Sequence, residues 1–181
     1  MITRALLESA QQRAVEMIRD SGVVITEDEA SAIDAVDFGL SNLEAEGAQI
    51  LTMVQTERVS VKLLVLFPNQ TEPEHWHPPV DDDPGKEETV RVVKGPVYFY
   101  VDGPDTLSGG FIVPGKESVY TCRHEVVLHA GEQMTLQPGA KHWFQAGAEG
   151  AVLYSYSSVA RDVLDGFTDP LIRRETVVVD D

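Results

Sequence analysis

Residues 73–95, Pro-Glu-His-Trp-His-Pro-Pro-Val-Asp-Asp-Asp-Pro-Gly-Lys-Glu-Glu-Thr-Val-Arg-Val-Val-Lys-Gly, contain the most informative pattern in the chain. His75 and His77 are two residues apart, so an extended strand places both imidazoles on one face. A loop rich in Pro and Asp follows, and Glu87 and Glu88 begin a second strand-like run. If the two runs pair, one glutamate returns to the histidines. Two imidazoles and a carboxylate on adjacent strands outline a metal site.

A third imidazole is available far down the chain at His142, in the run Lys-His-Trp-Phe. A His-x-His pair by itself is more often solvated than bound to metal. The later glutamate and His142 each enter a strand after a turn rich in Pro or Gly, and this clustering favours a metal site. Glu87 and Glu88 alternate faces, so one of them is expected to be a ligand and the other to be solvated.

The chain is strongly acidic, with a net charge of −16 over 181 residues. Phosphate backbones and anionic membrane surfaces repel such a protein, so neither a nucleic acid nor a membrane is an expected partner. No apolar run is long enough to span a bilayer, and the N-terminus lacks the apolar core of a signal peptide. The one cysteine, Cys122, cannot form an internal disulfide framework. These features together predict a cytoplasmic protein.

Helices are predicted before residue 48 and strands after it. Residues 3–20 have apolar side chains at helical spacing, and the run from Thr26 to Glu29 has the capping-box spacing of a second helix that extends to about Ala35. Alternating apolar residues then predict strands at 49–55, 58–67, 89–93, 96–101, 125–128, 133–136, 142–145 and 151–157, with a final edge strand at 177–179.

Many short strands with close-spaced turns indicate a sandwich or barrel rather than a parallel α/β sheet. We therefore predict one mainly β domain. Its two parts are a helical extension, residues 1–47, and the barrel on which the extension packs, residues 48–181.

His75-x-His77 followed by Glu88 resembles the first metal motif of the cupins, and the run from Gly131 to His142 resembles the second. Cupins are jelly rolls built from two sheets. The resemblance thus implies a cupin-like jelly-roll β-barrel, preceded here by N-terminal helices. The gap between His77 and Glu88 is longer than in most cupins.

The long gap is part of a closer resemblance. The chain is similar to the short-chain bacterial D-lyxose isomerases at residues 64–68, 73–80, 85–89 and 141–147, and the similarity extends from Ser21 to Pro170. The resemblance implies a metal-dependent aldose–ketose isomerase that acts on a free sugar, either D-lyxose to D-xylulose or D-mannose to D-fructose. It also implies a homodimer.

Carried over by position, the resemblance implies that a divalent metal, manganese or zinc, is held by His75, His77, Glu88 and His142. It implies a catalytic role for Lys62, pointing into the barrel. Three imidazoles and a carboxylate leave two positions open on an octahedral ion, enough for the two oxygens of a hydroxy-carbonyl. A cation that touches both oxygens stabilises the enediolate, and a lysine can place charge or a proton on the oxygen that becomes anionic.

Ser155 departs from the family pattern, which has a glutamate, interpreted as the catalytic base, at the matching position. Either another residue supplies the base, or the substrate or the chemistry differs. Two alternative functions stay open for this reason. An iron-dependent dioxygenase uses the same ligand types, although Lys62 suits a hydroxylated substrate better. A cupin that binds metal or sugar without catalysis is the other alternative.

Overall fold

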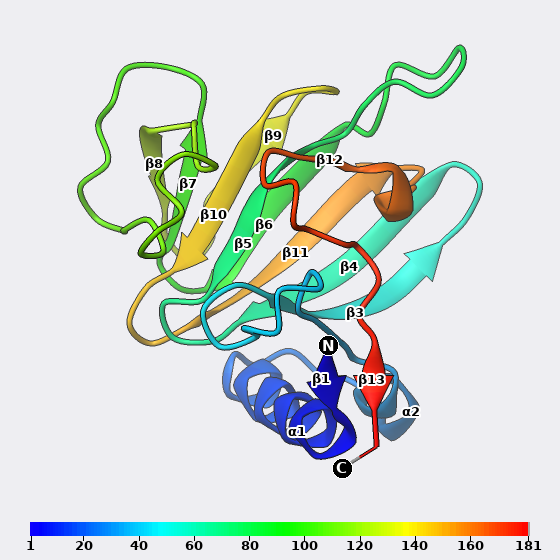
Figure 1. Ribbon diagram of the computed structural model, residues 1–181. Helices are drawn as coiled ribbons and strands as arrows, with labels where there is room; N and C mark the ends of the chain where they lie inside the picture. Colours follow the sequence, from blue (N-terminus) through cyan, green and yellow to red (C-terminus); the bar gives the residue numbers. More distant parts are fainter. Residues whose placement is uncertain (181) are drawn as a thin grey trace.

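Two facing antiparallel sheets form the main body of the computed structural model, which describes residues 1–180 (Figure 1). Asp181, the last residue of the predicted barrel, lies outside this part. In order across the larger sheet, the strands are β2 (Asp34–Val36), β3 (Ala48–Gln55), β4 (Val59–Leu66), β11 (Ala151–Ser158), β6 (Glu88–Lys94) and β9 (Gln133–Leu136). Across the smaller sheet they are β12 (Gly166–Phe167), β5 (Thr71–Trp76), β10 (His142–Ala146), β7 (Val97–Val101) and β8 (His124–Leu128).

The chain passes back and forth between the two sheets after β4. Strands β6, β9 and β11 join the larger sheet, whereas β5, β7, β8 and β10 join the smaller one. This alternation is typical of a jelly roll, and it confirms the predicted mainly β, cupin-like architecture.

The expected pairing of the two strands in the first motif is wrong. β5 pairs with β10 and β12, whereas β6 pairs with β11 and β9 in the opposite sheet. The long connection between them, residues 77–87, is not a tight hairpin, and it carries the chain from one sheet to the other. The histidines of the first motif therefore meet Glu88 across the interior and not along one sheet.

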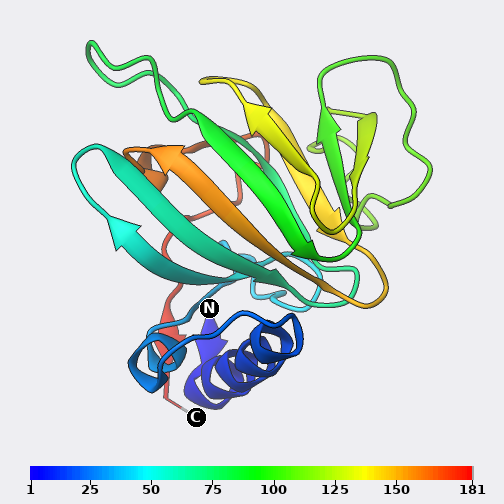
Figure 2. The same ribbon diagram turned by 180° about the vertical axis from the view of Figure 1, so that it is seen from behind.

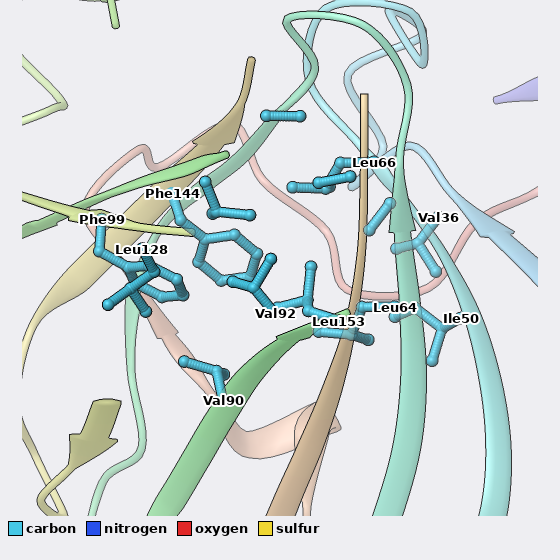
Figure 3. Packing of buried hydrophobic residues seen from close by; sticks show 14 of the residues in the cluster. Val36, Ile50, Leu64, Leu66, Val90, Val92, Phe99, Leu128, Phe144 and Leu153 are labelled. Carbon is cyan, nitrogen blue, oxygen red and sulfur yellow. The ribbon is translucent and has the colours of Figure 1, made fainter. Parts of the chain in front are cut away.

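Apolar side chains from both sheets fill the space between them (Figure 3). Phe99 and Phe144 of the smaller sheet stack with their ring centroids 4.6 Å apart. Leu64 and Leu153 belong to the same buried cluster and come from the larger sheet. Full burial of each such side chain contributes about 1.5–3 kcal/mol, so this core holds the two sheets in a fixed relation.

Two helices pack on the outer face of the larger sheet, and both lie below the sheets in Figures 1 and 2. α1 (Arg4–Asp20) is confirmed, with the Thr3 hydroxyl accepting a hydrogen bond from the Leu6 amide. α2 (Glu27–Ser31) has the predicted capping box but ends earlier than expected. Residues 34–36 form β2 instead, because pairing with β3 satisfies their backbone groups and Val36 joins the core between the sheets.

The two ends of the described chain meet beside the helices. β1 (Ile2–Thr3) pairs in parallel with β13 (Val178–Val179), so the predicted final strand exists but joins the N-terminus and not the barrel edge. Within residues 1–180, no helix combines the length and the apolar composition that a bilayer crossing requires. The division of the chain between residues 47 and 48 stays a prediction, since β2 precedes it and belongs to the larger sheet.

The segment between β11 and β13 crosses the open side of the sandwich (Figure 1). It contains a short 3-10 helix, η1 (Asp162–Leu164), and then β12, which adds to the edge of β5. This segment covers the interior near the histidines and contributes side chains to the site described below.

Candidate active site

Three buried imidazoles meet between the sheets. His75 lies on β5, His77 just beyond it, and His142 begins β10, where its Cα pairs with that of His75. The nitrogen atoms through which they could bind a metal all lie within 4.8 Å of one another. The structure thus brings together the histidines of two motifs that are more than sixty positions apart in the sequence.

Backbone carbonyls fix the orientation of two of these rings. The Nδ1 atoms of His75 and His142 lie 2.8 Å and 2.9 Å from the carbonyl oxygens of Pro73 and Ala140, so Nδ1 donates and Nε2 keeps a lone pair. Within residues 1–180, Nε2 of His142 and both nitrogens of His77 are buried without a hydrogen-bond partner. Burial lowers the pKa of all three, that of His77 to about 3.

Neutral imidazoles with free, converging lone pairs are the form in which histidine binds a metal. Buried nitrogens without partners are rare in folded proteins, and a bound ion would satisfy them. The residues present therefore fit a divalent metal.

Glu88 approaches the histidines from β6 in the opposite sheet. Its Oε2 atom lies 3.5 Å from Nε2 of His77 and 3.6 Å from Nζ of Lys86, and the Ser155 hydroxyl donates a hydrogen bond to Oε1. Although burial favours the neutral acid, Lys86, His77 and Ser155 lower the pKa of Glu88 to about 2. Glu87 is exposed, so the alternation of faces holds and only Glu88 faces the histidines.

Cationic side chains surround the same space and share one carboxylate. Lys62 of β4 forms an ion pair with Asp162 of η1, and Lys86 and Arg174 lie 3.5 Å and 3.4 Å from the same carboxylate. Although burial opposes its ionisation, these three cations keep the pKa of Asp162 well below its usual range. Lys86 was not predicted from the sequence. The available signal was its place after Gly85, which has a φ of 105° and turns the chain into β6.

A narrow pocket beside the histidines contains further acidic groups that the sequence analysis missed. Its polar lining residues are Lys62, Glu72, His75, Lys86, Glu88, Asp162, Asp165 and Arg174. Burial raises the pKa of Glu72 and that of Asp165 to about 7. Apolar side chains, among them Phe144 and Phe167, line the rest of the pocket. Acidic and basic groups around converging metal ligands suit a small, hydroxylated substrate.

The remaining histidines and the aromatic pair after His142 have structural surroundings. His124 and His129 belong to β8 and the turn after it, outside the histidine cluster. Trp143 stacks on Tyr100 at 3.8 Å on the outer side of the smaller sheet, whereas Phe144 faces the core. The two aromatic side chains therefore point to opposite faces of the smaller sheet, and both are buried.

Curated proteins match nearly the whole chain, although no family model matches it. The D-lyxose ketol-isomerase of Cohnella laeviribosi is 48% identical over 170 residues, which are 93% of each chain. The chain belongs to the D-lyxose ketol-isomerase family. Further family members are the D-lyxose/D-mannose isomerase of Thermosediminibacter oceani, 45% identical over 96% of this chain and 97% of that one, and the D-lyxose ketol-isomerase of a Thermofilum species, 42% identical over 99% and 100%. As a member of this family, the protein is a sugar isomerase.

Solved structures with the same fold include L-ribose isomerases. The enzyme of Cellulomonas parahominis without ligand superposes with a TM-score of 0.80 at 18% identity, and 98% of each chain is covered. The enzyme of Acinetobacter sp. DL28 in complex with L-ribose gives a TM-score of 0.79 at 16% identity, with the same coverage. Identities this low show a shared fold and nothing further about this chain.

Proposed function

We propose that this protein interconverts D-lyxose and D-xylulose, or D-mannose and D-fructose, on a divalent metal held by His75, His77, Glu88 and His142. The observation that carries the proposal is the set of buried imidazole nitrogens without partners, which converge next to a carboxylate. The family relatives are named for D-lyxose and D-mannose. Those names favour isomerisation over the dioxygenase and the non-catalytic alternatives.

The proposed metal is manganese or zinc, and iron also suits this ligand set. When bound, it would supply a Lewis acid that polarises the sugar carbonyl and stabilises the negative charge of the enediolate. Ser155 and Lys86 hold the Glu88 carboxylate in its ionised form, which is the form that binds a cation.

Lys62 is proposed to handle the protons of the two sugar oxygens. Its ammonium is buried in the pocket, and the Asp162 carboxylate holds it there. Isomerisation converts one carbonyl oxygen to a hydroxyl and the neighbouring hydroxyl to a carbonyl. Lys62 would donate a proton to the first oxygen and accept the proton of the second, so its own protonation state is restored after each turnover.

Metal analysis and a sugar panel test the proposal together. The purified protein is expected to contain about one equivalent of divalent metal per chain and to form ketose from D-lyxose or D-mannose. His142→Ala is expected to lose the metal, whereas His129→Ala, which alters an exposed histidine outside the cluster, keeps both metal and activity. Metal retained in His142→Ala would refute the ligand assignment. A wild type that forms no ketose from any common pentose or hexose would refute the isomerase reaction.

We also propose that the protein is cytoplasmic, as predicted from its composition, and that it is a homodimer, as the family resemblance implies. Light scattering on the purified chain tests the dimer, and a mass of a single chain at micromolar concentration would exclude it.

A further inference from the structure

The proposed isomerisation requires a group that moves a proton between two adjacent carbons, and this inference rests on that proposed function. The hydroxyl of Ser155, at the position where the family pattern has a glutamate, donates to Glu88 and has too weak a basicity for the task. Lys62 is paired with the Asp162 carboxylate and is already proposed to handle the protons of the sugar oxygens. The base is therefore sought among the carboxylates that line the pocket.

A β-bulge turns Glu72 toward the histidines. In the β5–β10 ladder, His142 pairs with His75 but Phe144 pairs with Glu72, so two steps along β10 match three along β5. Paired residues face the same side of a sheet, and Phe144 faces the core. Glu72 therefore faces the interior together with His75. Pro73, which has no N–H for the ladder, lies within the bulge.

Glu74 shows the opposite orientation two positions later on the same strand. Its buried carboxylate accepts hydrogen bonds from the backbone of Thr121 and Cys122 and from the Thr168 hydroxyl. These bonds satisfy it, and they fix it on the outer side of β5. Strict alternation would have placed Glu72 on that outer side as well. The bulge thus separates a structural glutamate from one that faces the pocket.

The carboxylate of Glu72 is available for chemistry. Its Oε2 atom is buried, yet it has no hydrogen-bond partner within residues 1–180. The residue lines the same pocket as Lys62, His75 and Glu88. Burial, followed by the charge of Glu88, raises its pKa to about 7, which suits a group that both accepts and donates a proton near neutral pH. The charged groups around it are Lys62, Lys86, Glu88 and Arg174.

We propose that Glu72 is the catalytic base that carries the substrate proton between C2 and C1. Its carboxylate takes the proton from C2 of the aldose, and the electron pair of that C–H bond forms the C1=C2 double bond while O1 becomes anionic. Lys62 gives a proton to O1 and takes the hydroxyl proton from O2. Glu72 then returns its proton to C1, which leaves C2 as the ketone and both side chains in their initial states.

Asp165 is the competing carboxylate. It lines the same pocket and has a raised pKa, but it lies on the segment after η1 and not on a strand of either sheet. A rigid strand positions a reacting group more precisely than such a segment does. Glu72 is preferred for this reason.

The test compares Glu72→Gln with Glu87→Gln in the metal-loaded, full-length protein. Glu87 offers the same chemical change on an exposed residue beside Glu88. Glu72→Gln is expected to keep the metal and the KM within a few-fold but to lower kcat by about 10²–10⁴-fold. It should also lose the acid limb of the pH–rate profile and the incorporation of solvent deuterium at C1 of the ketose. Glu72→Asp, which retains a carboxylate, should recover part of the rate, and Glu87→Gln should match the wild type.

Three results would overturn the role of Glu72. One is a Glu72→Gln variant with an unchanged pH profile and a kcat within about 10-fold of the wild-type value, because loss of the catalytic base is expected to lower kcat by more than that. Another is loss of metal from that variant, which would make Glu72 a ligand. The third is solvent exchange that persists in Glu72→Gln but vanishes in Asp165→Asn. A wild type without any isomerase activity would instead refute the proposed function, and the role of Glu72 with it.

Discussion

Ser155→Ala is predicted to destabilise the metal-free protein through the buried carboxylate that it leaves without a partner. The two other polar neighbours of Glu88, His77 and Lys86, both approach Oε2, whereas the Ser155 hydroxyl is the hydrogen-bond donor to Oε1 in the described chain. Ser155 is 2% and Glu88 6% exposed, so water does not readily replace the lost donor. A hydrogen bond to a buried charge contributes about 1.5–3 kcal/mol.

We therefore expect the free energy of unfolding to fall by about 2 kcal/mol at neutral pH. In a domain of this size, that loss lowers Tm by about 4–8 °C. The effect must depend on pH, because the hydrogen bond favours the ionised form of Glu88, whose pKa is lowered to about 2. Its stabilisation is fully present above the unfolded pKa near 4.5 and disappears as pH falls from about 4.5 to about 2.

Urea unfolding of chelator-treated protein at neutral and acidic pH measures both quantities. Ser157→Ala is the matched control, since Ser157 lies two positions further on β11 and its hydroxyl makes no hydrogen bond within residues 1–180. If Ser155→Ala and Ser157→Ala lose the same stability, or if the Ser155→Ala loss persists unchanged at acidic pH, the contact with Glu88 does not stabilise the fold.

Three further predictions concern catalysis, pH and the loop before β6. Lys62→Ala should keep the metal but lower kcat by about 10²–10⁴-fold. Metal analysis and a ketose assay on the same variant measure both effects. A fully active variant would show that Lys62 has no part in the mechanism. In the metal-free protein the pKa of His77 is about 3, below its unfolded value of 6.5. The free energy of unfolding should therefore fall by about 3–5 kcal/mol as the pH is lowered from 6.5 to 3, because the unfolded chain takes up the proton first. A His77→Gln variant with the same pH dependence would contradict this. Gly85→Ala should cost about 1–3 kcal/mol and lower activity, because a Cβ at its φ of 105° would lie 2.5 Å from the His77 carbonyl. Gly115→Ala, at a φ of 83° with no atom within 4 Å, should cost less in the same thermal melt.

Local periodicity predicted most of the secondary structure. Helix α1 and strands β3, β4 and β6 to β11 lie close to their predicted ranges, because their apolar residues recur with the period of the element that buries them. The second helix was predicted too long, since the edge pairing of residues 34–36 with β3 is a tertiary contact. The pairing of β5 with β6 was wrong for a similar reason, because the sequence does not show which sheet a strand joins after a long loop.

The composition of the site was only partly predictable. The spacing of His75 and His77, with Glu88 and His142, singled out residues that the structure gathers. Lys86 and the acidic residues of the pocket were missed, because no periodicity marks a side chain that approaches from a turn or from the C-terminal segment. Glu72 was missed because alternation along an unbroken strand places it on the wrong face. The proline after it was the available signal of a bulge.

The sequence by itself determined which residue types could bind a metal and which segments would be strands, since both follow from spacings of a few residues along the chain. Only the tertiary structure decided that Glu88 meets the histidines across the sandwich, that one of two nearby glutamates on β5 faces the pocket, and that Asp162 gathers the cations around it. These features depend on the sheet that each strand joins and on one extra residue in a ladder, and such long-range pairings leave no local pattern in the sequence.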